Sequence, residues 1–276
     1  GAVTPSSEKP MVLVDPKTGK ALAASAPAMK DGKEVGTYTV DETTGKVTFT
    51  PNKEFTGIAE PIVVQVIEKA TGKAIAGLKY TPTVTPVTPT GEDVTTTGKQ
   101  GKVQTGTPKF TEGDSEVPLK VDADQPAKFV VNGNAVDDTT IDATKDGAKV
   151  GTYTLDPLTG EVTFTPNKDF VGTPDAVTVQ VKDENGTTAT AKYTPTVTAV
   201  TPTGEDVTST GKQGKVQTGT PKFTEGDAEV PLKADAEQPA KFVVNGTAVD
   251  DTTIDAMKDG AKVGTYAINP LTGEVT

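Results

Sequence analysis

An internal repeat constrains this chain more than any other feature. Tyr153 recurs as Tyr266 after 113 residues, and Tyr38 precedes Tyr153 by 115. Residues 85–163 and 198–276 differ at ten of 79 aligned positions. We therefore divide the chain into three units: repeat 1 (1–84), repeat 2 (85–197, complete) and repeat 3 (198–276). Residues 1–10 are interpreted as an expression-vector remnant followed by a linker.

Each repeat contains one pattern typical of a β-hairpin. In repeat 2, Tyr153, Leu155, Val162 and Phe164 alternate with threonines and charged residues, which is the period of a half-buried antiparallel strand pair. The connecting 156–160 has a Pro that presets φ and a Gly that supplies a positive φ. The same unit occurs in the other repeats, at 36–51 and from 264 onward.

The remaining patterns also predict strands and turns, and none predicts a helix. Ile62–Ile67 reads as a buried strand, and Asn132-Gly133 suits a type I′ turn. The glycine-rich stretch 91–116 is predicted to be irregular, with up to two edge strands. Prolines in 81–90 and 194–203 predict stiff extended spacers rather than central strands. The predicted fold is all-β: small antiparallel β-sandwich repeats joined end to end in an elongated array.

The outer repeats are expected to be incomplete. Repeat 1 has no counterpart of 91–116, and repeat 3 stops at the counterpart of Thr163. Strand edges of repeat 3 should therefore be unpaired, so this repeat is expected to fray or to complete its sheet with another chain.

Composition excludes several kinds of chemistry. A net charge of −11 argues against nucleic acid or an anionic membrane as a partner. The chain has no His and no Cys, which removes histidine-based triads, thiol catalysis and thiolate metal sites. No apolar run approaches the roughly 20 residues of a membrane-spanning helix. We predict no enzymatic activity, no cofactor and no metal.

Several spaced motifs resemble one family of bacterial repeats. They are the hairpin pattern Gly-Thr-Tyr-Thr-x₄-Thr-Gly-x-Val-Thr-Phe-Thr-Pro-Asn-Lys, the segments 170–174 and 193–197, and the opening segment 100–108. Together they resemble the CshA-type fibril repeat, over almost the whole chain. The resemblance implies a long, secreted, cell-wall-anchored adhesin of streptococci and their relatives. Tandem repeats would form its shaft, and a separate N-terminal region would bind host fibronectin. Repeat 1 departs from the pattern at its missing start and at 59–61.

Carboxylate pairs are the remaining candidates for acid and base chemistry. Asp137-Asp138 and Asp250-Asp251 directly follow a predicted strand, where adjacent side chains point to opposite faces. We interpret them as solvated turn acids.

Three further motifs could form binding or modification sites, but each is better explained by a structural role. Asp122, Asp124 and Asp183 with Glu184 could supply oxygen ligands to calcium, although no twelve-residue calcium loop is present. The glycines Gly98 and Gly101 precede no helix and make a poor phosphate site. The sequons at Asn185 and Asn245 lie at predicted turns.

An intramolecular Lys–Asn isopeptide bond is the sharpest alternative. It requires a buried neutral Lys and a nearby protonated carboxyl group. Lys168 beside Asn167, and Lys120, are conceivable participants, but the sequence does not bring them together.

The predicted function is structural: the repeats project a host-binding region away from the cell wall, as a monomeric shaft. The alternative is that the repeats themselves bind a host matrix protein such as fibronectin, by strand addition at an exposed edge. A glycan site is disfavoured because the chain has no Trp and only 5 Tyr.

Overall fold

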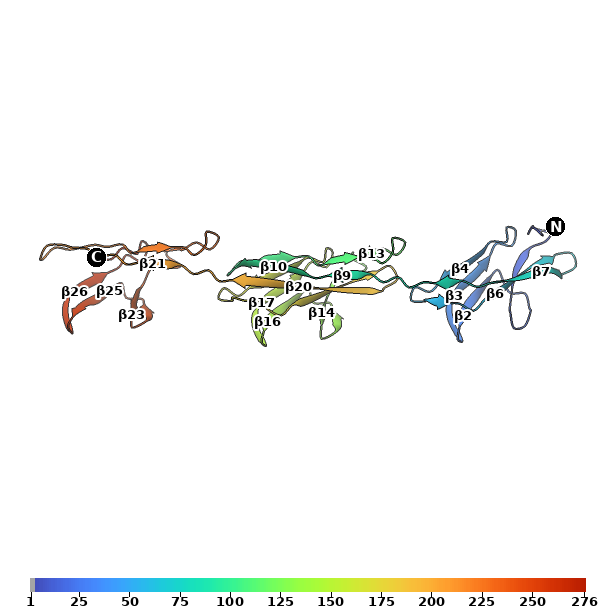
Figure 1. The fold of residues 1–276 in the computed structure, drawn as a ribbon, viewed down its shortest axis with the longest axis horizontal. Coiled ribbons are helices and arrows are strands. Elements are labelled where there is room, and N and C mark those ends of the chain that lie inside the picture. The colour runs from blue at the N-terminus through green and yellow to red at the C-terminus, as the bar shows by residue number, and fades with distance from the viewer. Residues whose placement is uncertain (1–2) are drawn as a thin grey trace.

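The three repeats follow one another in a line (Figure 1). The computed structural model describes residues 3–276, so the first two residues of the interpreted vector remnant lie outside it. The described residues form strands and turns with no helix, and so include no helix capable of crossing a membrane. The prediction of an all-β array is confirmed.

Repeat 1 forms two three-stranded antiparallel sheets. Its strands are β1 (Met11–Val14), β2 (Ser25–Lys30), β3 (Lys33–Val40), β4 (Val47–Pro51), β5 (Gly57–Ile58), β6 (Ile62–Glu68), β7 (Lys73–Tyr80) and β8 (Thr83–Val84). The sheet orders are β1-β6-β7 and β2-β3-β4, and β5 pairs with β8. The alternating residues of these strands enclose a core that includes Leu13, Ala28, Tyr38 and Ile62.

Repeat 2 is the most complete sandwich. Its strands are β9 (Thr90–Glu92), β10 (Val94–Lys99), β11 (Gln104–Gly106), β12 (Lys109–Thr111), β13 (Leu119–Lys120), β14 (Lys128–Val131), β15 (Asn134–Val136), β16 (Thr140–Lys145), β17 (Ala148–Leu155), β18 (Val162–Pro166), β19 (Val177–Asp183) and β20 (Thr188–Thr198). One sheet has the order β10-β20-β19-β14-β15, with β13 also on β19, and the other has the order β11-β18-β17-β16.

The core of repeat 2 lies between these two sheets. Phe129, Phe164 and Tyr193 are fully buried, and Tyr153 is 2% exposed. The predicted hairpin is β17–β18, in which Tyr153 pairs with Phe164 and Leu155 with Val162. Its inward side chains therefore pack against the strands of the opposite sheet.

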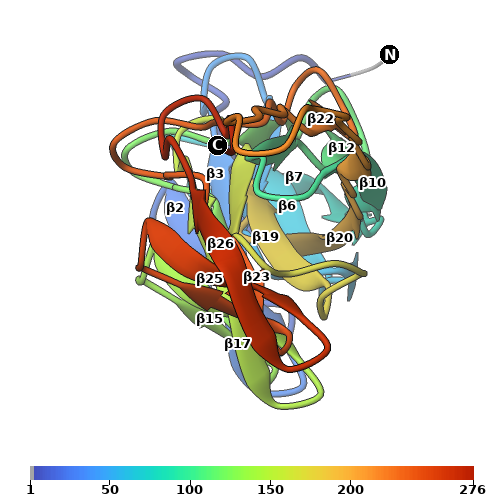
Figure 2. The same ribbon diagram turned by 90° about the vertical axis from the view of Figure 1, so that its left-hand side faces the viewer.

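Repeat 3 forms separate two-stranded ladders. Its strands are β21 (Thr203–Glu205), β22 (Lys222–Thr224), β23 (Phe242–Val244), β24 (Thr247–Val249), β25 (Thr253–Lys258) and β26 (Ala261–Ala267). The pairs are β21–β22, β23–β24 and β25–β26. Seen along the array, β25–β26 lies toward the same side as β2 and β17, so the repeats share a similar rotation about the long axis (Figure 2).

One sequence prediction was right in part and another was wrong. The stretch 91–116 supplies two edge strands, β10 and β11, which pair with β20 in a parallel ladder and with β18. It is more regular than predicted, because it also contains most of β9 and all of β12, which pair with each other. The supposed spacer after Tyr193 begins as strand, since β20 continues through Pro195 to Thr198. Pro195 is tolerated because the β19 ladder ends at the Val177–Tyr193 pair, so no β19 residue pairs with it.

Candidate functional site

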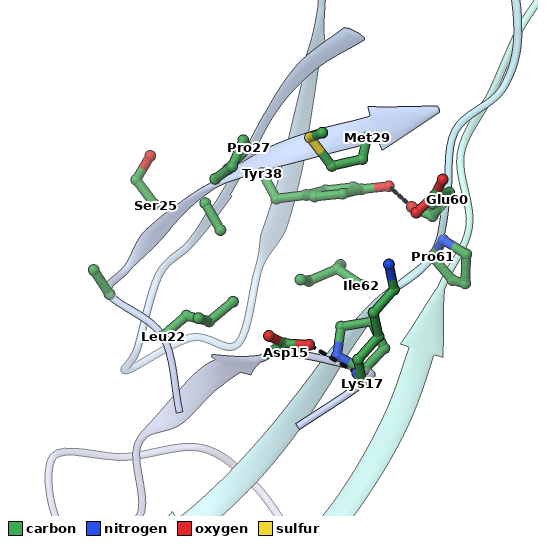
Figure 3. Close-up of a pocket in the computed structure, with 13 residues that line it drawn as sticks. Asp15, Lys17, Leu22, Ser25, Pro27, Met29, Tyr38, Glu60, Pro61 and Ile62 are labelled. Carbon is green, nitrogen blue, oxygen red and sulfur yellow. Dashed lines mark hydrogen bonds between the residues drawn. The ribbon is translucent and has the colours of Figure 1, made fainter. Parts of the chain in front are cut away.

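A hollow of about 330 Å³ lies beside Tyr38 in repeat 1 (Figure 3). Its apolar wall includes Leu22, Ala26 and Ile62, contributed by the connection after β1 and by β2 and β6. Asp15, Lys17 and Glu60 bring charged groups to the same hollow. The hollow therefore combines an apolar wall with charged side chains.

Local hydrogen bonds fix the polar groups around this hollow. The Tyr38 hydroxyl donates to the carbonyl oxygen of Glu60 at 2.6 Å (Figure 3). Asp15 Oδ1 accepts the backbone N–H of Lys17 at 2.7 Å, as in an Asx turn. Burial raises the pKa of Tyr38, with smaller contributions from Tyr80 and Glu60, so its hydroxyl stays protonated at neutral pH.

A small residue in β2, Ala26, lines the hollow. Ala26 of repeat 1 pairs with Tyr38, and its counterparts opposite Tyr153 and Tyr266 are Ile141 and Ile254. Ile141 packs against the core of repeat 2, where the Tyr153 hydroxyl donates to the Asp175 carbonyl at 2.8 Å. Repeat 1 therefore keeps the tyrosine contact but lacks the side chain that fills the neighbouring space.

Two polar side chains of the hollow already have hydrogen-bond partners within the chain. The Tyr38 hydroxyl donates to the carbonyl oxygen of Glu60. Asp15 Oδ1 accepts the N–H groups of Lys17 and Thr18 in its own turn. Among residues 3–276, no group of three His, Cys, Asp or Glu residues could hold a metal ion.

The predicted acidic pairs lie on the surface. Asp137 Oδ1 is 2.7 Å from Lys128 Nζ, and Asp250 Oδ1 is 2.6 Å from Lys241 Nζ. These lysines hold the pKa of each carboxyl below its usual range. Asp138 and Asp251 are exposed. The arrangement is that of solvated, paired turn acids.

The structure does not assemble the proposed calcium ligands. Asp122 and Asp124 are exposed, and Asp122 Oδ1 accepts the N–H groups of Asp124 and Gln125. Asp183 is buried at the end of β19, where its Oδ1 accepts the N–H groups of Asn185 and Thr187. Asp183 therefore stabilises the β19–β20 turn.

The cross-link candidates are not positioned for reaction. Lys120, Asn167 and Lys168 all lie at exposed positions, so the desolvation that neutralises a reactive lysine is missing. Asn167 Nδ2 donates to the Lys149 carbonyl at 3.2 Å. This amide orders the end of the hairpin instead.

The glycine and sequon motifs occupy turns and an edge strand. Gly98 lies in β10 and Gly101 in the following turn, with a positive φ. Asn185-Gly186 and Asn245-Gly246 form hairpin turns. Their composition is explained by backbone geometry.

Comparison with known families decides what kind of chain this is. The family described as "Surface adhesin CshA repetitive domain" matches residues 2–84, 86–197 and 199–276. The chain belongs to the CshA repeat family. Membership places it among surface-exposed adhesin repeats, as the resemblance implied.

Solved structures that resemble this CshA repeat chain share little sequence with it. One is mouse cadherin-23 EC22-24, with 12% identity, a TM-score of 0.27, and a match that covers 70% of this chain and 53% of that chain. Another is PcdhgB3 EC1-4, with 13% identity, a TM-score of 0.28, and a match that covers 82% of this chain and 56% of that chain. The chain thus spans about half the length of these structures. Its fold class rests on its own strands and sheets. A search of curated proteins gave no match.

Two features of the CshA repeats escaped the sequence reasoning. The hollow could have been suspected from Ala26, where the other repeats have Ile141 and Ile254. The ion pair between repeats 2 and 3 could not have been predicted from the sequence, because Lys99 and Asp227 lie 128 residues apart and carry no shared motif.

Proposed function

We propose that this chain is a section of the shaft of a cell-wall-anchored bacterial adhesin. The observation that carries the proposal is the linear arrangement of three repeats, each folded around its own strands (Figure 1). In such an array the reach increases with the number of repeats, while each unit contacts only its neighbours. The working units are residues 1–84, 85–197 and 198–276.

The surface of the array suits a spacer. The net charge of −11 makes neighbouring shafts repel, and the acidic pairs are exposed groups without a catalytic arrangement. We propose that the chain is monomeric, catalyses no reaction and binds neither nucleic acid nor membrane. Host fibronectin would be bound by other regions of the parent protein.

Two measurements test the shaft. A compact chain of this length has a radius of gyration of about 19 Å, so X-ray scattering should give a clearly larger value for an extended array. Surface plasmon resonance over immobilised fibronectin should show no saturable binding at low or physiological salt. A compact radius, or saturable binding at physiological salt, would contradict the proposal.

A second function is favoured by one exposed edge. β7 is the outer strand of its sheet, and Leu78 on it is 73% exposed. Its counterpart in repeat 2, Ala191, is buried beside Gly91, where an added Cβ would lie 3.0 Å from the Ala191 Cβ. The edge of repeat 1 therefore differs from the covered edge of repeat 2.

We propose as the alternative that repeat 1 binds an extended segment of a host matrix protein at this edge. If the chain binds fibronectin in the resonance assay, Leu78→Lys should abolish the signal, because a charge interrupts strand addition. Lys192→Glu, on the covered strand of repeat 2, is the matched control and should bind as the parent chain does. Binding that survives Leu78→Lys would exclude this edge.

A further inference from the structure

One ion pair joins two repeats. Lys99, the last residue of β10 in repeat 2, has its Nζ 3.2 Å from Asp227 Oδ2 of repeat 3. The Asp227 side chain is 25% exposed, whereas the carboxylates of the other ion pairs among residues 3–276 are at least 57% exposed. The inter-repeat contact is therefore the most sheltered of these pairs.

The acidic turn that carries Asp227 is fixed against the linker. A Cβ on Gly226 would lie 2.4 Å from the carbonyl oxygen of Thr201, so only glycine permits this approach. Asp227 Oδ1 accepts the N–H of Glu229 at 2.9 Å, which leaves Oδ2 for Lys99. This backbone hydrogen bond and then Lys99 lower the pKa of Asp227, so it is charged at neutral pH.

The other side of the junction is held by Gln100. Its backbone N–H donates to the Thr198 carbonyl at 2.9 Å, and its Oε1 accepts the N–H of Val200 at 3.2 Å. Its Nε2 donates to the Lys168 carbonyl at 3.2 Å. The linker is thus bonded to repeat 2 up to Val200 and packed against repeat 3 from Thr201.

The junction between repeats 1 and 2 has only the acidic half of this arrangement. A Cβ on Gly113 would lie 2.6 Å from the Thr88 carbonyl, and Asp114 Oδ1 accepts the N–H of Glu116 at 2.8 Å. Residues 3–84 place no lysine in an ion pair with repeat 2. Asp114 forms no ion pair within residues 3–276, and the junction instead has Lys53 Nζ donating to the Glu184 carbonyl at 3.1 Å.

We propose that Lys99 provides a docking surface for the Glu-Gly-Asp turn of the following repeat, that Gln100 holds the linker beside it, and that these contacts fix the orientation of one repeat relative to the next. Both halves recur along the chain: Lys212 and Gln213 repeat Lys99 and Gln100, and residues 112–114 repeat the turn. Complete repeats would therefore lock in series. The inference goes beyond the shaft function, because an array with freely bending junctions would still be elongated.

The absence of cysteine makes the test direct, since two introduced cysteines can carry spin labels without background labelling. Lys145 and Lys258 are exposed equivalent positions in repeats 2 and 3, and Lys30 is the equivalent in repeat 1. Pulsed electron resonance on K145C/K258C measures the distance distribution across the second junction. The pair K30C/K145C measures it across the first junction.

We expect a narrow distribution across the second junction that broadens on K99Q or D227N. The double variant should be no broader than either single variant, because both remove the same contact. Sodium chloride at 1 M should broaden the distance distribution of the parent chain, because it shortens the screening length to about 3 Å. It should leave the distribution of K99Q unchanged. D114N should leave the distance distribution across the first junction unchanged. This variant controls for the loss of a turn carboxylate.

Distributions of equal width in the parent chain and in K99Q, at both salt concentrations, would overturn the lock. Amide spectra of each variant verify that repeats 2 and 3 remain folded. Failure of the lock would leave the scattering and fibronectin results untouched, so it is distinguishable from failure of the shaft proposal.

Discussion

Repeats 2 and 3 have almost the same sequence in different structural surroundings. Tyr153 is 2% exposed in β17, whereas its counterpart Tyr266 in β26 is 49% exposed. The strand pairing is nevertheless the same, since Ile141 pairs with Tyr153 and Ile254 with Tyr266. The hairpins are therefore specified locally, whereas the core also requires β18, which extends the sheet beside β17, and β19 and β20, which cover the inward face of that sheet in repeat 2.

This contrast predicts its largest effect at the buried tyrosine. Tyr153→Ala should lower the free energy of unfolding of repeat 2 by about 3–5 kcal/mol, as for other large aromatic truncations in cores. Tyr266→Ala should change the free energy of unfolding of repeat 3 by about 0.5 kcal/mol or less, because Tyr266 is already 49% exposed. Urea unfolding followed through the amide signals of each repeat measures both. Equal losses would show that the core of repeat 2 does not depend on the closing strands.

The hollow in repeat 1 predicts the next largest effect. Ala26→Ile introduces the residue found in the other repeats and should stabilise repeat 1 by about 0.5–2 kcal/mol by filling the space. Ala28→Ile is the control, because Ala28 is fully buried and the added atoms should cost about 1–3 kcal/mol. Thermal unfolding of the two variants should therefore shift in opposite directions. Destabilisation by both would mean that repeat 1 cannot accommodate an isoleucine beside Tyr38.

The hydrogen bond of the tyrosine hydroxyl, which occurs in both repeat 1 and repeat 2, predicts a smaller effect on stability. Tyr38→Phe and Tyr153→Phe each remove one hydrogen bond to a backbone carbonyl, of Glu60 and Asp175 respectively. Each change should cost about 1 kcal/mol. Denaturant midpoints of the two variants should fall by similar amounts. A loss confined to one repeat would show that the two contacts are not equivalent.

The smallest effect concerns acid. The pKa of Asp41 is lowered to about 2, first by the N–H of Thr44 and then by the hydroxyl and N–H of Thr43. A lowered pKa in the folded state means that this turn contributes stability above the ordinary value of 3.8 and loses it as the pH falls toward 2. Titration of the Asp41 carboxyl carbon by NMR should give the lowered value.

Repeat 3 supplies a natural control for that titration. Asn269 occupies the equivalent turn position, and its Oδ1 accepts the N–H of Leu271 at 3.0 Å without a charge. Asp41→Asn should therefore keep the turn while removing its contribution to the acid dependence of repeat 1. An Asp41 carboxyl that titrates at its ordinary value would contradict the capped turn.

Local signals in the sequence were sufficient for the hairpins. Asn132 and Gly133 both have positive φ, as the predicted type I′ turn requires, and they join β14 to β15. The Tyr153 hairpin has the predicted alternation of buried and exposed residues in β17. These elements could be predicted because each pattern lies within a few residues.

Long-range pairing could not be predicted in the same way. β10 has few apolar residues, and it becomes a strand because β20 lies beside it about 100 residues later. Pro195 seemed to exclude a central strand, but the sheet is narrower at that point. The hollow beside Tyr38 likewise depends on residues from β2 and β6 that meet only in the folded chain.

The parallel ladder between β10 and β20 has a mechanical consequence. Its register runs from Val94 opposite Tyr193 to Lys99 opposite Thr198, so the chain enters repeat 2 near one end of the ladder and leaves at the other. β20 lies along the long axis of the array (Figure 1). Tension along the array therefore pulls the two strands past each other in shear, and the hydrogen bonds of the ladder share the load instead of opening one at a time.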